Sequence, residues 1–81
     1  MATQNITIKT ITSSPTTLRN LNSISVLNGS TLENLTIGVD GSGELITLTS
    51  GQTLTLNAST GFSLPDMVIS GTSLNAQVIY S

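Results

Sequence analysis

The segment LTIGVDGSGELITLTSGQTLTL, residues 35–56, decides the fold. Apolar and polar side chains alternate along three parts of it, which is the pattern of β-strands that bury one face. The sequences DGSG and SGQ separate these parts and are typical of tight turns. The segment therefore predicts three consecutive antiparallel strands joined by hairpins.

The turn sequences also predict how the first two of these strands pair. A two-residue turn at residues 42–43 would place Val39 opposite Ile46. The same register places Ile37 opposite Leu48. All four side chains then lie on one face, because side chains two residues apart on a strand point to the same side.

The second turn extends this face to the third strand. A three-residue loop at residues 50–52 would place Leu48 opposite Leu54 and Ile46 opposite Leu56. We expect a shared apolar face formed by Ile37, Val39, Ile46, Leu48, Leu54 and Leu56. The opposite face is expected to carry the hydroxyl groups of Thr36, Thr47, Thr49, Thr53 and Thr55.

The chain before this segment predicts two further strands. They cover residues 5–11 and residues 21–26, and Pro15 marks a break between them because proline has no N–H for a central strand. Residues 15–21 form a weakly helical candidate, with Ser14 as its cap. The apolar pairs that share one strand face are Ile6 with Ile8, and Ile24 with Val26.

The chain after it predicts a loop over residues 58–65, which carries Phe62, and then a closing hairpin whose turn centres on residues 72–73. The expected cross-strand pairs are Met67 with Val78 and Ile69 with Ala76, with Tyr80 at the end of the same face. About seven short strands at spacings of roughly 8 to 12 residues predict an all-β fold, a small antiparallel β-sandwich or barrel.

The chain is short for a protein without crosslinks. Its 81 residues predict a single β domain, residues 1–81, and include neither cysteine nor histidine, which excludes disulfides and thiolate or imidazole metal sites. A core of this size seldom supplies more than about 3 to 5 kcal/mol of stability. We therefore expect further apolar burial between copies of the chain, as a homo-oligomer in which a trimer is favoured.

Charged residues make up only 7% of the chain, against roughly a quarter of an ordinary domain. Threonine, serine, asparagine and glutamine supply the polar surface instead, as in packed subunits or extracellular proteins. Lys9 and Arg19 are too few cations for nucleic-acid binding. No apolar run approaches the ~20 residues of a membrane span, so no membrane insertion is expected. The chain begins at Met1 without a secretory signal pattern, which predicts synthesis in a cytoplasm.

Few side chains are candidates for catalysis or metal binding. The carboxylates are Glu33, Asp40, Glu44 and Asp66, and acid–base catalysis needs two positioned ionisable groups. Asp40 and Glu44 flank one turn, where turn formation is the expected role and a weak calcium loop is the alternative. Without histidine no base is evident to activate a serine, since Lys9 is the single lysine. We expect no catalytic residue, no cofactor and no metal site.

Two recurring polar patterns have simple explanations. Asn-X-Ser/Thr triplets, which could accept glycans, begin at Asn5, Asn28, Asn34 and Asn57. The high serine and threonine content accounts for them. The Thr-X-Thr sequences at 47–49 and 53–55 could bind ice or glycans, but cross-strand threonines also stabilise a sheet. Sugar sites usually stack an aromatic ring, whereas Phe62 and Tyr80 are more simply core or subunit-contact anchors.

The C-terminal part of the chain contains LTSGQTLTLNAST, LPDMVISG and NAQVIYS. From about Leu45 to Ser81 it resembles small accessory proteins of tailed-bacteriophage virions, which are short, cysteine-free, all-β and rich in threonine and serine. The shared motif is a Gly-Gln-Thr-Leu turn followed by a closing Val-Ile-Tyr edge, and β domains of bacterial surface proteins can show similar sequences. The resemblance implies a capsid decoration or tail-associated protein, present in many copies as a trimer or ring, and carries over no catalytic residue.

We therefore expect a non-enzymatic virion structural protein, a capsid decoration or cement protein that binds the shell in many copies. Its expected partners are further copies of itself and the major capsid protein or another virion protein, and its expected location is the virion. Edge strands and apolar faces would pack against neighbouring subunits. The alternative is a carbohydrate-binding or adhesion module displayed on a virion or cell surface.

Overall fold

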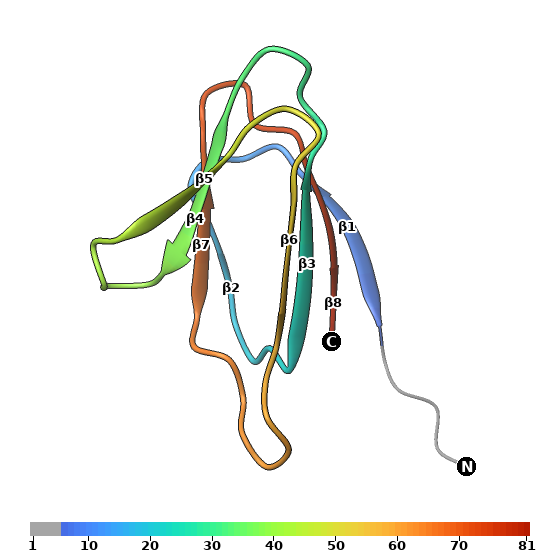
Figure 1. Cartoon of the computed structure of the whole chain (residues 1–81), viewed down its shortest axis with the longest axis vertical. Coiled ribbons are helices and arrows are strands. Elements are labelled where there is room, and N and C mark those ends of the chain that lie inside the picture. Colours follow the sequence, from blue (N-terminus) through green and yellow to red (C-terminus); the bar gives the residue numbers. More distant parts are fainter. Residues whose placement is uncertain (1–5) are drawn as a thin grey trace.

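Eight antiparallel strands form two four-stranded sheets in the computed structural model, which describes residues 6–81 (Figure 1). The first sheet has the order β1-β8-β3-β6 and consists of β1 (Thr7–Ile11), β3 (Ser23–Asn28), β6 (Thr53–Asn57) and β8 (Ala76–Tyr80). The second sheet has the order β2-β7-β4-β5 and consists of β2 (Thr16–Leu18), β4 (Leu35–Val39), β5 (Leu45–Leu48) and β7 (Met67–Ser70). The predicted all-β sandwich is confirmed, with one strand more than expected.

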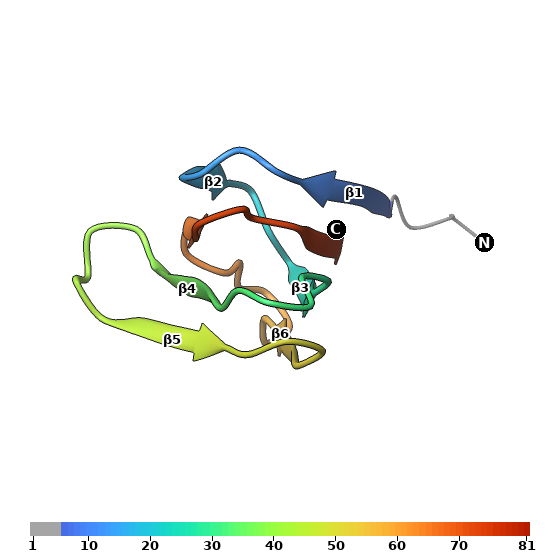
Figure 2. The same cartoon turned by 90° about the horizontal axis from the view of Figure 1, so that it is seen from above.

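The order of the strands follows from how the chain moves between the sheets. Six of the seven connections between consecutive described strands cross from one sheet to the other, and the β4–β5 hairpin stays within its sheet. This strand order is that of a jelly roll, an eight-stranded sandwich built from two Greek keys. Figure 2 shows the two layers from above, with β1 and β2 on one side and β5 and β6 on the other. Within residues 6–81 there is no helix long and apolar enough to cross a membrane.

The core lies between the sheets and is built from alternate strand positions. In β3, Ile24, Val26 and Asn28 are buried, whereas the intervening Ser25 and Leu27 are half-exposed. The buried apolar residues are Ile11, Leu18, Leu21, Ile24, Val26, Leu35, Ile37, Leu48, Met67, Ile69, Leu74, Ala76 and Val78. Full burial of a Val, Leu, Ile or Met side chain contributes roughly 1.5–3 kcal/mol, so these residues supply the main drive for closing the sandwich.

The β4–β5 hairpin has the predicted faces but a different register. Ile37 lies opposite Ile46, where the prediction placed Val39. The Ser42 N–H donates to the Val39 carbonyl oxygen at 3.1 Å, and Gly41 has a φ of +82°, so the turn centres two residues earlier than predicted. Because the shift is an even number of residues, the inward and outward faces are unchanged.

The predicted pairing of β5 with β6 is wrong. β6 pairs with β3 in the first sheet, where Leu56 lies opposite Ile24. The loop between β5 and β6 is bonded to the end of β3: the Gly51 N–H donates to the Asn28 carbonyl oxygen, and the Asn28 N–H donates to the Gln52 carbonyl oxygen, each at 3.0 Å. These bonds direct the chain into the first sheet and prevent a local hairpin.

The predicted closing hairpin is also wrong. Met67 and Val78 were expected to pair, but β7 pairs with β2 and β4 in the second sheet, whereas β8 pairs with β1 and β3 in the first. The connection between them buries Leu74, and its Asn75 carbonyl oxygen accepts the Gly29 N–H at 2.8 Å. Met67 and Val78 keep their inward positions, and both belong to the core as members of opposite sheets.

The N-terminal predictions hold in part. The predicted strand 21–26 corresponds to β3, and its two apolar side chains are buried. The weak helical candidate at residues 15–21 is wrong, because this stretch contains the short strand β2. Ile6 and Ile8 are exposed, at 61% and 78%. Asn5, where the first predicted strand begins, lies outside the described residues.

Candidate functional site

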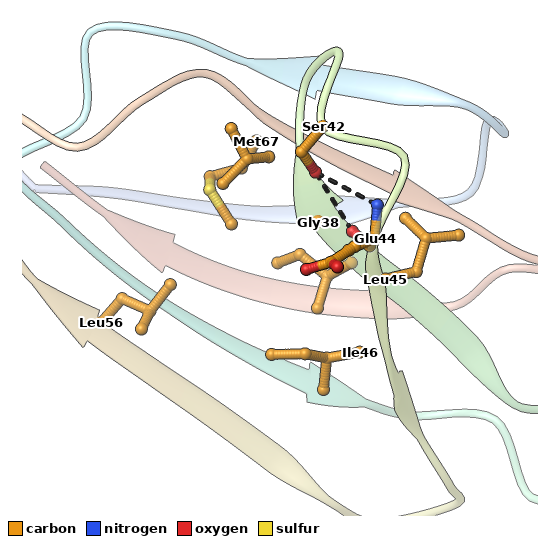
Figure 3. A pocket seen from close by; sticks show the side chains of 9 residues that line it. Gly38, Ser42, Glu44, Leu45, Ile46, Leu56 and Met67 are labelled. Carbon is orange, nitrogen blue, oxygen red and sulfur yellow. Dashed lines mark hydrogen bonds between the residues drawn. The ribbon is translucent and has the colours of Figure 1, made fainter.

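The β4–β5 hairpin projects away from the first sheet (Figure 1), and an apolar groove opens beside it (Figure 3). Its volume is about 380 Å³. The residues that line it are Ile37, Gly38, Val39, Ser42, Glu44, Leu45, Ile46, Leu56 and Met67. We call this feature the hairpin groove. Most of its lining is aliphatic, and Glu44 is its one charged side chain.

The groove exists because the two sheets separate along the hairpin. Ile37 and Leu48 point inward and are buried. Val39 and Ile46 also occupy inward positions, yet they are 40% and 53% exposed. The first sheet does not cover them, and Leu56 of β6 is only half-buried at the other side of the opening. Residues patterned for a core are therefore left at the surface.

Two small residues shape the hairpin that carries the groove. A Cβ atom at Gly38 would collide with the carbonyl oxygen of Glu44 and lie 2.8 Å from Cδ2 of Leu45. The Ser42 hydroxyl accepts the Glu44 N–H at 3.2 Å and donates to the Glu44 carbonyl oxygen at 3.3 Å (Figure 3). The close approach of the two strands at this point thus requires glycine.

Gly38→Ala should lower the free energy of unfolding by about 1–3 kcal/mol, because an added methyl group forces the neighbouring backbone apart. Urea denaturation followed by far-UV circular dichroism measures this change. Ser42→Ala in the same hairpin is the control, and it should cost under about 1 kcal/mol because its hydrogen bonds are exposed. A Gly38→Ala protein as stable as the control would show that the hairpin relaxes around the methyl group.

A second apolar surface lies on the outer face of the first sheet. Ile8 of β1 and Ile79 of β8 are cross-strand partners and are 78% and 49% exposed. Together with Leu27 of β3 they border a shallow depression of about 150 Å³. We call this surface the β1 face. On the outer sheet face of a monomer, such positions normally carry threonine or charged residues that are solvated. An exposed aliphatic pair is therefore a candidate contact surface.

The carboxylates do not form a cluster. Arg19 forms an ion pair with Asp66, with 3.1 Å between the guanidinium and carboxylate atoms, and both side chains are substantially exposed. Exposed pairs of this kind contribute about 0–1 kcal/mol. Within residues 6–81 no three Asp, Glu, His or Cys side chains lie close enough together to hold a metal ion. Between Asp40 and Glu44 the structure shows a turn, in which the Ser42 N–H donates to the Val39 carbonyl oxygen and the Glu44 N–H to the Ser42 hydroxyl, and the calcium loop stays an untested alternative.

Single changes of the four carboxylates to their amides should each alter the unfolding free energy by less than about 1 kcal/mol and any self-association by less than about tenfold. The residues are Glu33, Asp40, Glu44 and Asp66. Thermal unfolding and sedimentation equilibrium measure the two quantities. A much larger effect at one position, with the fold intact by circular dichroism, would indicate a carboxylate site at that position.

Asn28 is a structural residue that the sequence patterns singled out only as the start of a glycosylation triplet. Its side chain is 1% exposed, and its amide nitrogen donates to the carbonyl oxygens of Glu33 and Leu48, each at 2.9 Å. Its side-chain oxygen accepts the Ser30 N–H at 3.0 Å. This burial argues against glycan attachment at Asn28. The available signal was its spacing, because Asn28 continues the inward positions of Ile24 and Val26.

The threonines predicted to form one hydroxyl face are divided between the sheets. Thr47 lies on the second sheet, whereas Thr55 lies on the first and shares a 3.2 Å hydrogen bond with the Ser25 hydroxyl. These contacts are the cross-strand pairs of an ordinary sheet. Phe62 is 74% exposed in the β6–β7 loop, and Tyr80 packs against the core. The two rings, predicted to be core or subunit-contact anchors, therefore differ: Tyr80 packs against the core, and Phe62 lies at the surface.

Searches of protein-family models, of curated proteins and of solved structures find no match to this chain. The chemistry of its surfaces remains the basis for a functional argument. The hairpin groove and the β1 face consist mainly of aliphatic side chains, with few charges nearby. Such surfaces bind through the removal of apolar area from water, which is how protein subunits recognise one another.

Proposed function

We propose that the protein is a non-enzymatic structural subunit of a virion, a capsid decoration or cement protein that associates with itself and binds the shell in many copies. The observation that supports this most strongly is the exposure of patterned core residues, Val39 and Ile46, in the hairpin groove. A second apolar surface around Ile8 and Ile79 gives each copy two separate places for contact.

The size of the subunit favours assembly. A stable protein–protein contact covers about 800 Å² on each partner. The accessible surface of the chain is 5232 Å², so one such contact would use a substantial part of it. At about 25 cal/mol per Å² of apolar area, burial in contacts would add to a core that is small on its own.

The fold is compatible with both functions that the sequence suggests. Jelly rolls occur in viral capsid and in lectin domains, and a fold by itself does not decide between them. The resemblance of residues 45–81 to phage accessory proteins favours the virion. A sugar site usually needs an aromatic platform, and because Tyr80 packs against the core, Phe62 is the one exposed ring that could supply it.

Multi-angle light scattering on the purified chain at micromolar concentrations tests the assembly, with a homo-oligomer expected and a trimer favoured. Quantitative mass spectrometry of purified particles tests the location, with a fixed ratio of this chain to the major shell protein expected. A folded protein that stays monomeric and is absent from particles would overturn the proposal. Specific signals on a glycan array from such a protein would support the carbohydrate-binding alternative.

A further inference from the structure

Two of the four sheet edges are exposed on both faces. In β1, the four residues Thr7, Ile8, Lys9 and Thr10 are all exposed, and in β5 the residues Leu45–Thr47 are all exposed. The other two edge strands differ, because β2 buries Leu18 and β6 has half-buried side chains at alternate positions. β1 and β5 therefore extend beyond the sandwich as strands that have a neighbour along one side only.

These two edges can accept a further strand. Each lies at the end of its sheet's strand order, and Figure 2 places them at opposite corners of the molecule. Among the described residues, no backbone hydrogen bond joins Thr7–Thr10 or Leu45–Thr47 to a segment beyond its own sheet. Neither strand contains a proline, and free N–H and C=O groups on such an edge are a template for pairing with another chain.

We propose that β1 of one copy pairs antiparallel with β5 of a second copy, with Ile8 opposite Leu45 and Lys9 opposite Glu44. This inference rests on the self-association proposed above and specifies its contact. Ile8 and Leu45 are 78% and 57% exposed, so their pairing buries apolar area on one face of the new ladder. On the other face, the same register brings together a cation and an anion.

The charges favour this combination over the pairing of like edges. Among the described residues, Arg19 already forms an ion pair with Asp66, whereas neither Lys9 nor Glu44 has a partner of opposite charge. A contact between two β1 strands offers no acid to Lys9, and a contact between two β5 strands offers no cation to Glu44. Opposite charges directly across a β-ladder stabilise it, and like charges destabilise it.

The contact joins two different surfaces, so it is heterologous. After a first contact the pair of copies keeps one free β1 and one free β5, so the contacts continue until a ring closes. The first sheet of one copy then continues into the second sheet of the next. The proposed trimer is one such ring.

Two edge variants used together test this arrangement. Ile8→Glu should block β1, and Leu45→Glu should block β5, so each variant alone should be monomeric by light scattering at concentrations where the parent is oligomeric. An equimolar mixture should form a dimer and nothing larger, because one unaltered β5 meets one unaltered β1. The altered edges carry the same sign of charge and therefore cannot pair with each other.

Leu32→Glu is the matched control, because Leu32 is 89% exposed in the loop between β3 and β4 and belongs to neither edge strand. It should leave the oligomer unchanged. Circular dichroism should show the parental fold for all three variants, because each of the replaced side chains is exposed.

A charge exchange adds an independent measurement. Lys9→Glu or Glu44→Lys alone should weaken association by about fivefold, and the double variant should restore it.

A mixture of the two edge variants that stays monomeric would overturn the pairing, as would an oligomer that survives Ile8→Glu or Leu45→Glu alone. Loss of association in Leu32→Glu would also overturn it, because the loss would then not depend on the edge strands. In each of these cases, if the parent protein is oligomeric, the proposed self-association still holds and only the β1–β5 contact is wrong. A monomeric parent would contradict both the self-association and the contact.

Discussion

Leu48→Ala is expected to lower the free energy of unfolding by about 2–5 kcal/mol. Leu48 is 5% exposed on β5, and it packs in the core opposite Leu35. The alanine variant loses the transfer energy of the removed atoms and leaves a cavity that a two-sheet core can fill only in part. Urea denaturation followed by far-UV circular dichroism measures the change, and the loss would be a large fraction of the total stability of so small a domain.

Thr47→Ser provides the matched control. Thr47 is adjacent in sequence, exposed on the outer face of the same strand and opposite Thr36, so its change should cost less than about 0.5 kcal/mol. Equal costs, or a reversed order, would show that β5 is displaced by one residue, since a slip of one exchanges the two faces of a strand.

The faces of most strands could be predicted from the sequence, whereas their partners could not. Alternation placed Ile37, Leu48 and Val78 inward, and all three are buried. The same alternation is compatible with a hairpin and with a connection that crosses between sheets, because it defines which side of a strand is buried and not which strand lies beside it. The short loops at Gly51 and Ser73 therefore indicated hairpins where the chain crosses the sandwich.

The hairpin groove could not be predicted from the sequence for a related reason. Val39 and Ile46 carry the pattern of core residues, and nothing local to the chain records that the first sheet stops short of them. The neutral character of the surface could be predicted, because it follows from composition alone.

Connections that pass from one sheet to the other depend on a polar residue in the core. Asn28 fixes the start of the β3–β4 connection through Ser30 and Glu33, and it holds the end of β5 through the Leu48 carbonyl oxygen. Its backbone also binds Gly51 in the β5–β6 loop. One buried residue thus ties the β3–β4 connection to the end of β5 and to the β5–β6 loop, for which the sequence patterns wrongly predicted a hairpin.

Asn28→Ala should therefore lower the free energy of unfolding by about 2–4 kcal/mol, because it leaves two carbonyl oxygens and one N–H near the core without their partner. Asn57→Ala is the control, since Asn57 is exposed at the end of β6 and its loss should cost under about 0.5 kcal/mol. Asn28→Leu separates the two contributions, because leucine fills the space without satisfying the polar groups. Thermal and urea unfolding of Asn28→Leu should remain close to those of Asn28→Ala; recovery of parental stability would show that the site needs volume rather than hydrogen bonds.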